Sequence, residues 1–459
     1  MTMNIALIFP RTRYPSGQPP LGILYLAAYL RRETDCHVDI IDTTFERHPM
    51  KYVETRLRER PYDLIGLSVM TSMLRAAKEI SRIAKQVHPQ ALLIWGGPHP
   101  TVLPEETLHI PQVDAVALGE GEETLLEIVQ RGGDLDGVAG VWYKANGDIR
   151  RNPSRPMIQD ISVLPHPARD LIDMGRYIDA WYSLTAASPL LRGTSVITSR
   201  GCPYSCTYCQ PTLRHLFGRK VRRRSVEDVI AELRHLKETY NIDAFMFEDD
   251  TFVVNRKWVF SFCEAMREAN LGLVWGCNSR ADLVEEEMFR AMRDAGLVQV
   301  NLGIESGSQR ILDDLYDKRI TIQDVENAAS IAKKLGLKVG GYFMLGAPTE
   351  TEEEIETTIR FAARLPIDEA AFNITTPLPG TYLYDRTKHL IVRDISEFDY
   401  YRASVYRPDA VLPSRRLDWL KKKAYIRFYL LTFRRARKAI TWFFSRAGIR
   451  KMMLRLKRF

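Results

Sequence analysis

The sequence predicts an α/β protein with a doubly wound parallel sheet at the N-terminus, then an open partial barrel of six βα units, then a basic helical region. Two observations support this fold class. Short β-rich runs alternate with amphipathic helical stretches through residues 1–150, and a second series of the same kind begins near residue 191. The runs are apolar on both faces, as expected of parallel strands covered by helices. A chain of 459 residues is long enough for two or three domains.

Residues 1–150 are expected to form the first domain. Strands are predicted at NIALIFP, HVDIID, DLIGLSVM, ALLIWGG and DAVALG, with helices at 21–32, near 52–59 and at 72–87. A ligand of such a sheet binds at the carboxyl ends of the strands. The segment GVWYKANGDIRRNP predicts a hairpin at Asn146-Gly147, because both residues accept the left-handed backbone of a tight turn.

Residues 151–190 contain several prolines and are expected to be a linker. The barrel is predicted over 191–385, with strands at SVITSR, AFMFEDD, VWGCNSR, VQVNLGIES, KVGGYFMLG and EAAFNITTPLPG. Its chemistry should lie at the strand C-termini. A helix is expected to open at Ser225 with Asp228 as its capping-box partner. Residues 386–459 are expected to form a C-terminal helical region.

Three of the six cysteines lie close together directly after the first predicted barrel strand, at Cys202, Cys206 and Cys209. Thiolates are suitable ligands for iron–sulfur clusters and for zinc. A structural zinc needs a fourth ligand, and His215 is near enough in sequence to supply it. One alternative is therefore a non-catalytic zinc module that docks nucleic acid. A cubane cluster held by three cysteines instead leaves one iron open to a cosubstrate.

The segment CPYSCTYC, residues 202–209, resembles the signature of the radical S-adenosylmethionine (radical SAM) enzymes, including the aromatic Tyr208 before the last cysteine. The resemblance implies a [4Fe-4S] cluster whose open iron chelates the amino and carboxylate groups of S-adenosylmethionine. It further implies reductive cleavage to methionine and a 5′-deoxyadenosyl radical, which removes hydrogen from an unactivated carbon. An electron donor such as flavodoxin or ferredoxin is the implied partner.

Other barrel segments resemble the family at the ends of successive strands. FEDDTF, residues 247–252, carries three acids where related enzymes hold the methionine ammonium, and a carboxylate near a cation gains more in a partly desolvated site than in water. A solvated acidic loop is the alternative. Arg280 resembles a position that meets the ribose or carboxylate, with a surface ion pair as the alternative. The residues implied to bind S-adenosylmethionine are Tyr208, Asp249, Asp250, Arg280, Glu305 and Gly346.

A doubly wound domain ahead of such a barrel resembles the cobalamin-binding class of the family, as do PPLGILYLAAYL and GEGEET. The resemblance implies cobalamin, bound without a histidine lower ligand because the D-x-H-x-x-G motif is absent after the first strand. His48 and His99 lie on other loops and are expected to be exposed. A domain that only recognises substrate is the alternative. The implied cobalamin-binding residues are Ser68, Gly96, Gly97, Gly119, Glu120 and Gly121.

Cobalamin-dependent C-methylation of a small-molecule or lipid substrate is the leading functional prediction. Radical cyclisation, rearrangement or carbon–carbon bond formation without cobalamin is the alternative within the family. Methylthiotransfer is disfavoured, because the additional N-terminal cysteine trio of such enzymes is missing. The sequence does not identify the substrate.

The net charge of +8 comes from the C-terminal end of the chain. From Ser414 to Phe459 there are sixteen Lys and Arg against one acid, which leaves −7 for the rest. Alternation of aromatic and basic residues predicts two or three amphipathic helices there. Packing on the barrel is expected for 417–430, and contact with an anionic membrane beyond Thr432. Nucleic acid is the less favoured polyanion.

The N-terminus lacks the features of a signal peptide, and the longest uncharged stretch, residues 14–30, is too short to span a bilayer as a straight helix. We therefore expect a cytoplasmic protein, with peripheral contact at the inner membrane surface through its C-terminal end. Cys36, Cys263 and Cys277 are scattered singly, so they are expected to be core residues in a reducing compartment.

Overall fold

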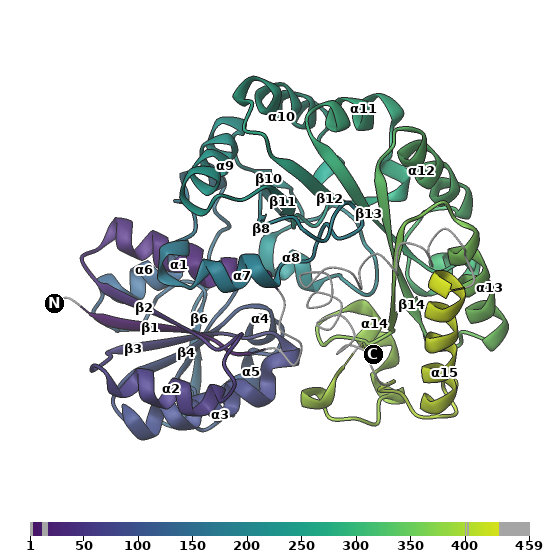
Figure 1. The fold of residues 1–459 in the computed structure, drawn as a ribbon. Helices are drawn as coiled ribbons and strands as arrows, with labels where there is room; N and C mark the ends of the chain where they lie inside the picture. The colour runs from purple at the N-terminus through teal and green to yellow at the C-terminus, as the bar shows by residue number, and fades with distance from the viewer. Residues whose placement is uncertain (1–2, 12–16, 400, 402–403, 431–459) are drawn as a thin grey trace.

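Two sheets organise the structure, one in each half of the chain (Figure 1). The computed structural model describes residues 3–11, 17–399, 401 and 404–430. Within these residues the predicted fold class is confirmed: a largely parallel N-terminal sheet is followed by a parallel six-stranded barrel sheet and C-terminal helices. The predicted domain limits at 150, 190 and 385 stay predictions.

The N-terminal sheet has the strand order β2-β1-β3-β4-β5-β6-β7, and its first five strands are parallel. Its strands are β1 (Asn4–Phe9), β2 (His37–Asp42), β3 (Leu64–Ser68), β4 (Leu92–Gly96), β5 (Ala115–Ala117), β6 (Val141–Ala145) and β7 (Asp148–Arg151). Because β1 lies between β2 and β3, the chain changes direction across the sheet at β1, and ligands of doubly wound sheets bind at such a point.

Helices cover both faces of this sheet. The helix α1 contacts α6 on one face and α2 contacts α3 on the other (Figure 1). The helical elements are α1 (Leu21–Glu33), α2 (Pro49–Arg58), η1 (Thr71–Met73), α3 (Leu74–Val87), α4 (Pro98–Val102), α5 (Pro104–Leu108) and α6 (Glu122–Gln130). Two separate apolar cores result, one under each helical layer.

The hairpin β6–β7 turns at Asn146 and Gly147, as predicted. Both residues have positive φ, 52° and 84°, and the two strands pair antiparallel. Asn and Gly are the residues that tolerate this backbone at low cost. The hairpin extends the parallel sheet by two antiparallel strands at one edge.

The linking segment contains η2 (Ile161–Val163), η3 (Arg169–Leu171) and α7 (Met174–Ala180). The barrel sheet follows in the order β15-β14-β13-β12-β11-β8, all parallel. Its strands are β8 (Gly193–Val196), β11 (Ala244–Phe247), β12 (Val274–Arg280), β13 (Leu297–Glu305), β14 (Lys338–Leu345) and β15 (Glu369–Ile374). The six predicted strands are therefore confirmed.

Helices line the outer face of the barrel sheet in Figure 1. They are α9 (Val226–Tyr240), α10 (Arg256–Ala269), α11 (Glu286–Asp294), α12 (Ile322–Lys334) and α13 (Glu352–Arg364). The short elements η4 (Phe252–Val254), η5 (Ala281–Leu283) and η6 (Ile311–Leu315) follow β11, β12 and β13 along the chain. The Ser225 side chain caps α9 by accepting from Asp228 N, as expected. The reciprocal half of the capping box is absent, because Ser225 N donates to Ser162 Oγ instead.

The C-terminal region contains α14 (Tyr382–Thr387), η7 (Lys388–Leu390), η8 (Ile395–Glu397), α15 (Ser414–Tyr425) and η9 (Ile426–Leu430). Tyr425 and Tyr429 receive hydrogen bonds from backbone N–H groups of β15, at 3.0 and 3.1 Å. Leu417 and Phe428 are buried. The predicted packing of 417–430 on the barrel is therefore confirmed, while the predicted membrane contact beyond Thr432 lies outside the described residues.

Three further expectations can be compared with the structure. Cys263 and Cys277 are buried as expected, whereas Cys36 is half-buried at the edge of a core. His48 is exposed as expected. The expectation for His99 was wrong: its side chain is 2 % exposed, because the loop after β4 folds back over the end of β3. None of the helices in the described parts of the chain combines the length and apolarity needed to cross a bilayer.

Candidate active site

The cysteine loop, which we define as residues 201–221, leaves the barrel through a short antiparallel ladder. The strands β9 (Ser199–Arg200) and β10 (Arg222–Arg223) pair at its base, and it contains α8 (Thr212–Phe217). Gly201 opens the loop with φ 97°, where a Cβ would lie 2.8 Å from Lys220 O. A glycine is therefore required for the two ends of the loop to approach. Thr207 ties the middle of the loop to the barrel, donating to Leu315 O at 2.6 Å and Tyr316 O at 2.9 Å.

The three thiols lie on this loop as free cysteines. Cys206 is buried, and Cys202 and Cys209 are half-buried. Burial raises the pKa of the Cys202 and Cys209 thiols, so a thiolate at either position needs compensating positive charge. Bound metal supplies such charge, and the donor set of three thiols on one loop fits an iron–sulfur cluster.

The zinc alternative is not supported by the geometry. In the part of the chain that the structure describes, no three His, Cys, Asp or Glu side chains converge as the ligands of a single ion do. His215 is exposed on α8, and its backbone carbonyl lies against Gly119 of the N-terminal half. The described residues therefore do not form the tetrahedron that a structural zinc needs.

A buried triad of Tyr208, Glu305 and Lys318 lies behind the cysteines. Lys318 Nζ donates to Glu305 Oε1 at 2.7 Å and to Tyr208 Oη at 3.0 Å, and Tyr208 Oη donates to Glu305 Oε1 at 3.1 Å. Glu305 has φ 66°, an unusual backbone for a residue with a Cβ. At Gly303, a Cβ would lie within 3 Å of both Glu305 Oε1 and Lys318 Nζ. Glycine there lets the charged pair pack directly against the backbone.

Arg280, at the end of β12, is 6 % exposed, so the surface ion pair considered for it is wrong. Its guanidinium donates to both oxygens of Asp282 at 3.0 Å and to Lys318 O at 2.7 Å. The third nitrogen lies 3.5 Å from Cys206 Sγ. The guanidinium carbon is 3.8 Å from the centre of the Tyr204 ring. This cation is therefore fixed in place beside a thiol.

The three acids after β11 lie in different surroundings. Asp249 is 2 % exposed and accepts from Thr198 N and Oγ1 at 3.2 and 2.8 Å and from Ser199 Oγ. Its carboxylate is thus engaged by the segment that leads into the cysteine loop. Asp250 reaches solvent, yet the surrounding protein and Asp249 raise its pKa to about 6. Glu248 accepts from Gln18 Nε2 at 2.8 Å and Ser195 Oγ at 3.0 Å, and burial raises its pKa.

Gly346 begins a tight turn after β14. Its φ is 77°, and a Cβ there would clash with Leu417 of α15. Glu350 closes the turn, because its Oε2 accepts from Gly346 N at 2.7 Å and Ala347 N at 3.0 Å. Burial raises the pKa of Glu350 to about 7, and its other oxygen has no hydrogen-bond partner among the described residues.

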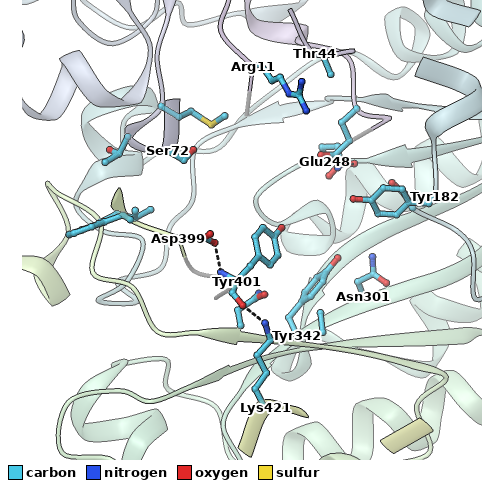
Figure 2. A pocket seen from close by; sticks show the side chains of 18 of the residues that line it. Arg11, Thr44, Ser72, Tyr182, Glu248, Asn301, Tyr342, Asp399, Tyr401 and Lys421 are labelled. Carbon is cyan, nitrogen blue, oxygen red and sulfur yellow. Dashed lines mark hydrogen bonds between the residues drawn. The ribbon is translucent and has the colours of Figure 1, made fainter. Parts of the chain in front are cut away.

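A cavity of about 2540 Å³ lies between the two sheets (Figure 2). An ordinary small-molecule pocket has roughly 300–1,000 Å³, so this space has room for a bulky cofactor together with a substrate. Residues that follow β1, β2 and β3 line one side, at the point where the sheet changes direction: Arg11, Thr44, Met70, Thr71 and Ser72. The barrel side includes Glu248, Asn301 and Tyr342, with Tyr182 from the linking segment.

The residues implied to bind cobalamin lie beside this cavity rather than in its described lining. Ser68 and Gly97 face each other: Gly97 has φ 93°, and a Cβ there would lie 3.3 Å from Ser68 Oγ. Gly96 ends β4, and Gly121 lies against Leu26. Gly119 N donates to Thr101 Oγ1 at 3.1 Å. Glu120 is buried, and its carboxylate pairs with arginines of the barrel half.

Sequence reasoning missed Lys318, Gln18 and the residues 70–72. Lys318 stands in YDKRIT, which reads as an exposed polar turn, although the side chain is 5 % exposed. No spacing within the segment marks its contact with Glu305. Residues 70–72 could have been found, since they directly follow a predicted strand at the end where ligands bind.

Two family models match the chain. The Radical SAM superfamily matches residues 196–362, which include the cysteine loop and the four central barrel strands β11 to β14. The B12 binding domain matches residues 11–129, which include most of the N-terminal sheet.

Named proteins match most of the chain. An uncharacterized methyltransferase, PH0819 of Pyrococcus horikoshii, is 37% identical over 442 residues, covering 93% of each chain. The anaerobic magnesium-protoporphyrin IX monomethyl ester cyclase of Rubrivivax gelatinosus is 28% identical, over 93% of this chain and 78% of its own. Among solved structures, the radical S-adenosylmethionine methyltransferase TsrM of Kitasatospora setae, with cobalamin and a [4Fe-4S] cluster bound, has TM-score 0.71 and 17% identity. It covers 86% of this chain and 76% of its own.

Proposed function

This chain belongs to the radical SAM superfamily, in the class that carries a B12 binding domain, and we propose that it is a cobalamin-dependent methyltransferase. The observation that carries the proposal is the combination of a three-thiol loop at the mouth of a parallel barrel with a large cavity that reaches the switch point of a doubly wound sheet. The two sites lie on one chain and need different cofactors. When bound, the cluster supplies the electron that cleaves S-adenosylmethionine, and cobalamin supplies the methyl group.

Cys202, Cys206 and Cys209 would hold the cluster. Three thiolates make it anionic, and two fixed cations outside the loop, Arg280 and Lys318, lie near enough to offset that charge. Arg280 lies beside Cys206 Sγ, and its guanidinium also donates to the backbone carbonyl of Lys318. In a site of low dielectric, such charges act more strongly than in water.

The remaining contacts to S-adenosylmethionine are assigned from the geometry of each side chain. Tyr208 and Glu305 would orient the nucleoside, because Lys318 holds both oxygens in place. Gly346 is kept on the adenine side from the family resemblance alone. Asp250, which reaches solvent, would hold the ammonium. We assign Asp249 a supporting role, because its oxygens already bind the segment before the cysteine loop.

The cavity would hold cobalamin and the substrate between the two halves of the chain. Residues that follow β1, β2 and β3 line the N-terminal wall, and the barrel wall presents both charged and neutral hydrogen-bonding side chains. Among these, Gln299 Nε2 donates to Asn301 Oδ1 at 3.0 Å. Glycine at position 340 makes room for the Asn301 amide, since a Cβ there would overlap it. These groups can orient a substrate that carries hydrogen-bonding atoms.

The proposal retains residues 1–150 as the cobalamin domain, 191–385 as the barrel and a small-molecule substrate. It includes a flavodoxin or ferredoxin as electron donor and cobalamin without a histidine below the cobalt. Radical cyclisation is the second candidate, because the cyclase of Rubrivivax gelatinosus matches 93% of this chain.

Anaerobic reconstitution with iron and sulfide tests the proposal. We expect the protein to bind a cluster, seen by its absorption and electron paramagnetic resonance, and to cleave S-adenosylmethionine under reducing conditions. Cys206→Ala should abolish both. Cys36→Ser, which changes a half-buried cysteine far from the loop in sequence, should retain both. Cluster formation and cleavage that persist in Cys206→Ala would overturn the assignment.

A further inference from the structure

A buried ion-pair network joins the N-terminal half of the chain to the base of the cysteine loop. Arg200 donates to Glu120 Oε1 at 2.7 Å and to Glu122 Oε1 at 2.5 Å. Arg222 donates to Glu120 Oε2 at 2.7 Å, and Ile158 N donates to the same oxygen at 2.9 Å. The side chains are between 4% and 12% exposed. Two carboxylates thus neutralise two guanidinium groups in a nearly dry contact.

The network lies where movement of the cysteine loop would begin. Arg200 is two residues before Cys202, and Arg200 and Arg222 are directly paired across the β9–β10 ladder that closes the loop. On the other side, Glu122 is the first residue of α6 and Glu120 lies just ahead of it. The carboxylates therefore come from the carboxyl end of the N-terminal sheet, and the guanidinium groups come from the two strands that support the thiols.

Two further contacts support the same junction. The Arg200 guanidinium lies 5.7 Å from the centre of the Tyr25 ring on α1. The helix α8 within the cysteine loop packs on α4 of the N-terminal half. At Gly119, a Cβ would lie 3.7 Å from His215 O on α8. The N-terminal half of the chain thus contacts the cysteine loop both at its base and at its helix α8.

A buried ion pair is a poor way to gain stability, because the cost of removing both charges from water offsets most of their attraction. It does fix geometry. An arginine guanidinium donates to carboxylates in its own plane, so a guanidinium that donates to two carboxylates tolerates little rotation or sliding. An apolar contact of the same area would allow both movements more easily.

We propose that Glu120, Glu122, Arg200 and Arg222 form a positioning clamp, which holds the cysteine loop at a fixed distance and orientation from the cobalamin domain. The clamp gives the GEGEET segment a role in placing one cofactor relative to the other rather than in contacting cobalamin through Glu120. This inference rests on the proposed function, because it concerns the distance between the two cofactors that the function requires.

The test uses the full chain, reconstituted with cluster and cobalamin, and compares wild type with Glu120→Gln/Glu122→Gln. Dipolar electron paramagnetic resonance between the reduced cluster and cob(II)alamin reports their separation. We expect one narrow distance distribution in the wild type and a broadened or shifted one in the double variant, with cluster and corrinoid content unchanged. Glu352→Gln, in an exposed pair on α13, should match the wild type. A narrow, unshifted distribution in the double variant would overturn the clamp.

Arg200→Lys provides a second variant that keeps the charge but loses the fork. It should broaden the distance distribution less than the double variant does; a distribution identical to the wild type would count against the clamp.

Calorimetry of the full chain without cofactors separates this inference from the proposed function. The wild type should unfold in one transition and the double variant in two, whereas one transition in both argues against the clamp. A wild type that binds neither cofactor contradicts the proposed function and leaves the calorimetric result to decide on the clamp.

Discussion

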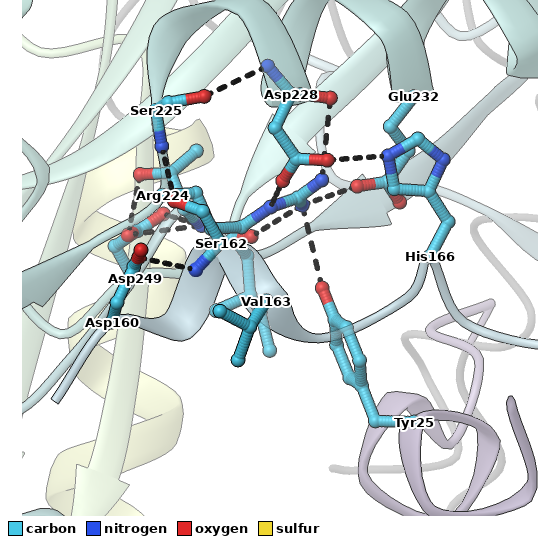
Figure 3. Close-up of polar contacts among 12 residues, drawn as sticks. Tyr25, Asp160, Ser162, Val163, His166, Arg224, Ser225, Asp228, Glu232 and Asp249 are labelled. Atoms are coloured by element: carbon cyan, nitrogen blue, oxygen red, sulfur yellow. Dashed lines mark hydrogen bonds and ion pairs between the residues drawn. The ribbon is translucent and has the colours of Figure 1, made fainter. Parts of the chain in front are cut away.

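Two clusters of buried charge lie in the barrel half of the chain, and they differ in what surrounds them. The joint cluster consists of Arg169, Arg224, Asp228 and Glu232 and connects the linking segment with the barrel. Figure 3 shows Arg224, Asp228 and Glu232 beside His166 of the linking segment. The site cluster consists of Tyr208, Arg280, Glu305 and Lys318 and lies against the cysteine loop. Both contain carboxylates paired with cations at hydrogen-bond distance. Their difference shows how one kind of interaction can serve architecture or chemistry.

The joint cluster closes on itself. Glu232 is fully buried and pairs with Arg169 at 2.5 Å and with Arg224. Burial alone would raise the pKa of Glu232, but Arg224 and Arg169 lower it to about 2. Asp228 accepts from Arg224 at 2.5 Å and pairs with His166 at 2.9 Å. These carboxylates are therefore already bound by protein cations, which is the mark of a structural joint.

The site cluster lies against the cysteine thiols, which are anionic when they bind metal. Its two cations are ordered by Glu305 and by Asp282, yet one nitrogen of Arg280 points to a cysteine sulfur. Gly303 lets Glu305 and Lys318 pack against the backbone of β13, because a Cβ there would overlap both side chains. Positive charge fixed beside thiols is what an anionic cluster needs. The comparison therefore predicts loss of stability from changes in one cluster and loss of binding from changes in the other.

The largest effect is expected for Glu232→Ala, which leaves two buried guanidinium groups without their shared carboxylate. Removing one partner of a buried pair costs about 3–5 kcal/mol, so the free energy of unfolding should fall by that amount in urea titrations. Glu352→Ala, which breaks an exposed pair with Arg416, should leave the free energy of unfolding nearly unchanged, because solvent screens such pairs. Equal small losses of unfolding free energy in Glu232→Ala and Glu352→Ala would show that the joint cluster stabilises the protein no more than a surface ion pair does.

The next largest effect is expected for the pH dependence of stability that His99 causes, because its side chain is buried without a charged partner. Its Nδ1 lies 3.2 Å from Thr71 Oγ1, and burial, aided by Lys78, lowers its pKa from 6.5 to about 4. Between pH 6.5 and 4 the unfolded chain takes up a proton that the folded chain does not, so stability falls as the pH falls through this range. At 1.36 kcal/mol per pKa unit, the loss is about 3 kcal/mol.

Urea titrations of the wild type and His99→Gln at several pH values measure this effect. The difference in unfolding free energy between the two proteins should shrink toward low pH, since only the wild type has a histidine whose pKa changes on unfolding. A difference that is independent of pH from 6.5 to 4 would show that His99 is charged or exposed in the folded protein.

Lys318→Met should weaken the binding of S-adenosylmethionine. Without the ammonium, Glu305 loses its 2.7 Å partner and its fixed orientation. Loss of a hydrogen bond to a charged group costs about 1.5–3 kcal/mol, which is a tenfold or greater rise in the Kd for S-adenosylmethionine. Equilibrium dialysis of the reconstituted protein measures this rise. Arg319→Gln, the exposed cation next in sequence, should leave the Kd unchanged, and a similar change in both variants would contradict a specific role for Lys318.

The sequence was sufficient for what depends on local pattern. The six barrel strands follow from apolar runs, the hairpin from Asn146-Gly147, and the cysteine loop from the spacing of its thiols. Contacts between segments far apart in the chain could not be predicted from the sequence. Glu120 and Arg222 are 102 positions apart, so GEGEET resembled a ligand segment and not an ion-pair partner. His99 was expected to be exposed because it lies on a loop, but His99 N donates to Val69 O and the side chain is buried against the end of β3.

The central claim is that both cofactor sites on this chain serve one methyl transfer. The most direct measurement incubates the reconstituted, cobalamin-loaded protein with S-adenosylmethionine labelled in its methyl group and follows the label by mass spectrometry. The account predicts that the label moves from S-adenosylmethionine to the bound corrinoid in the wild type. A protein that holds both cofactors, yet leaves all of the label on S-adenosylmethionine or on the methionine formed from it, would contradict the account.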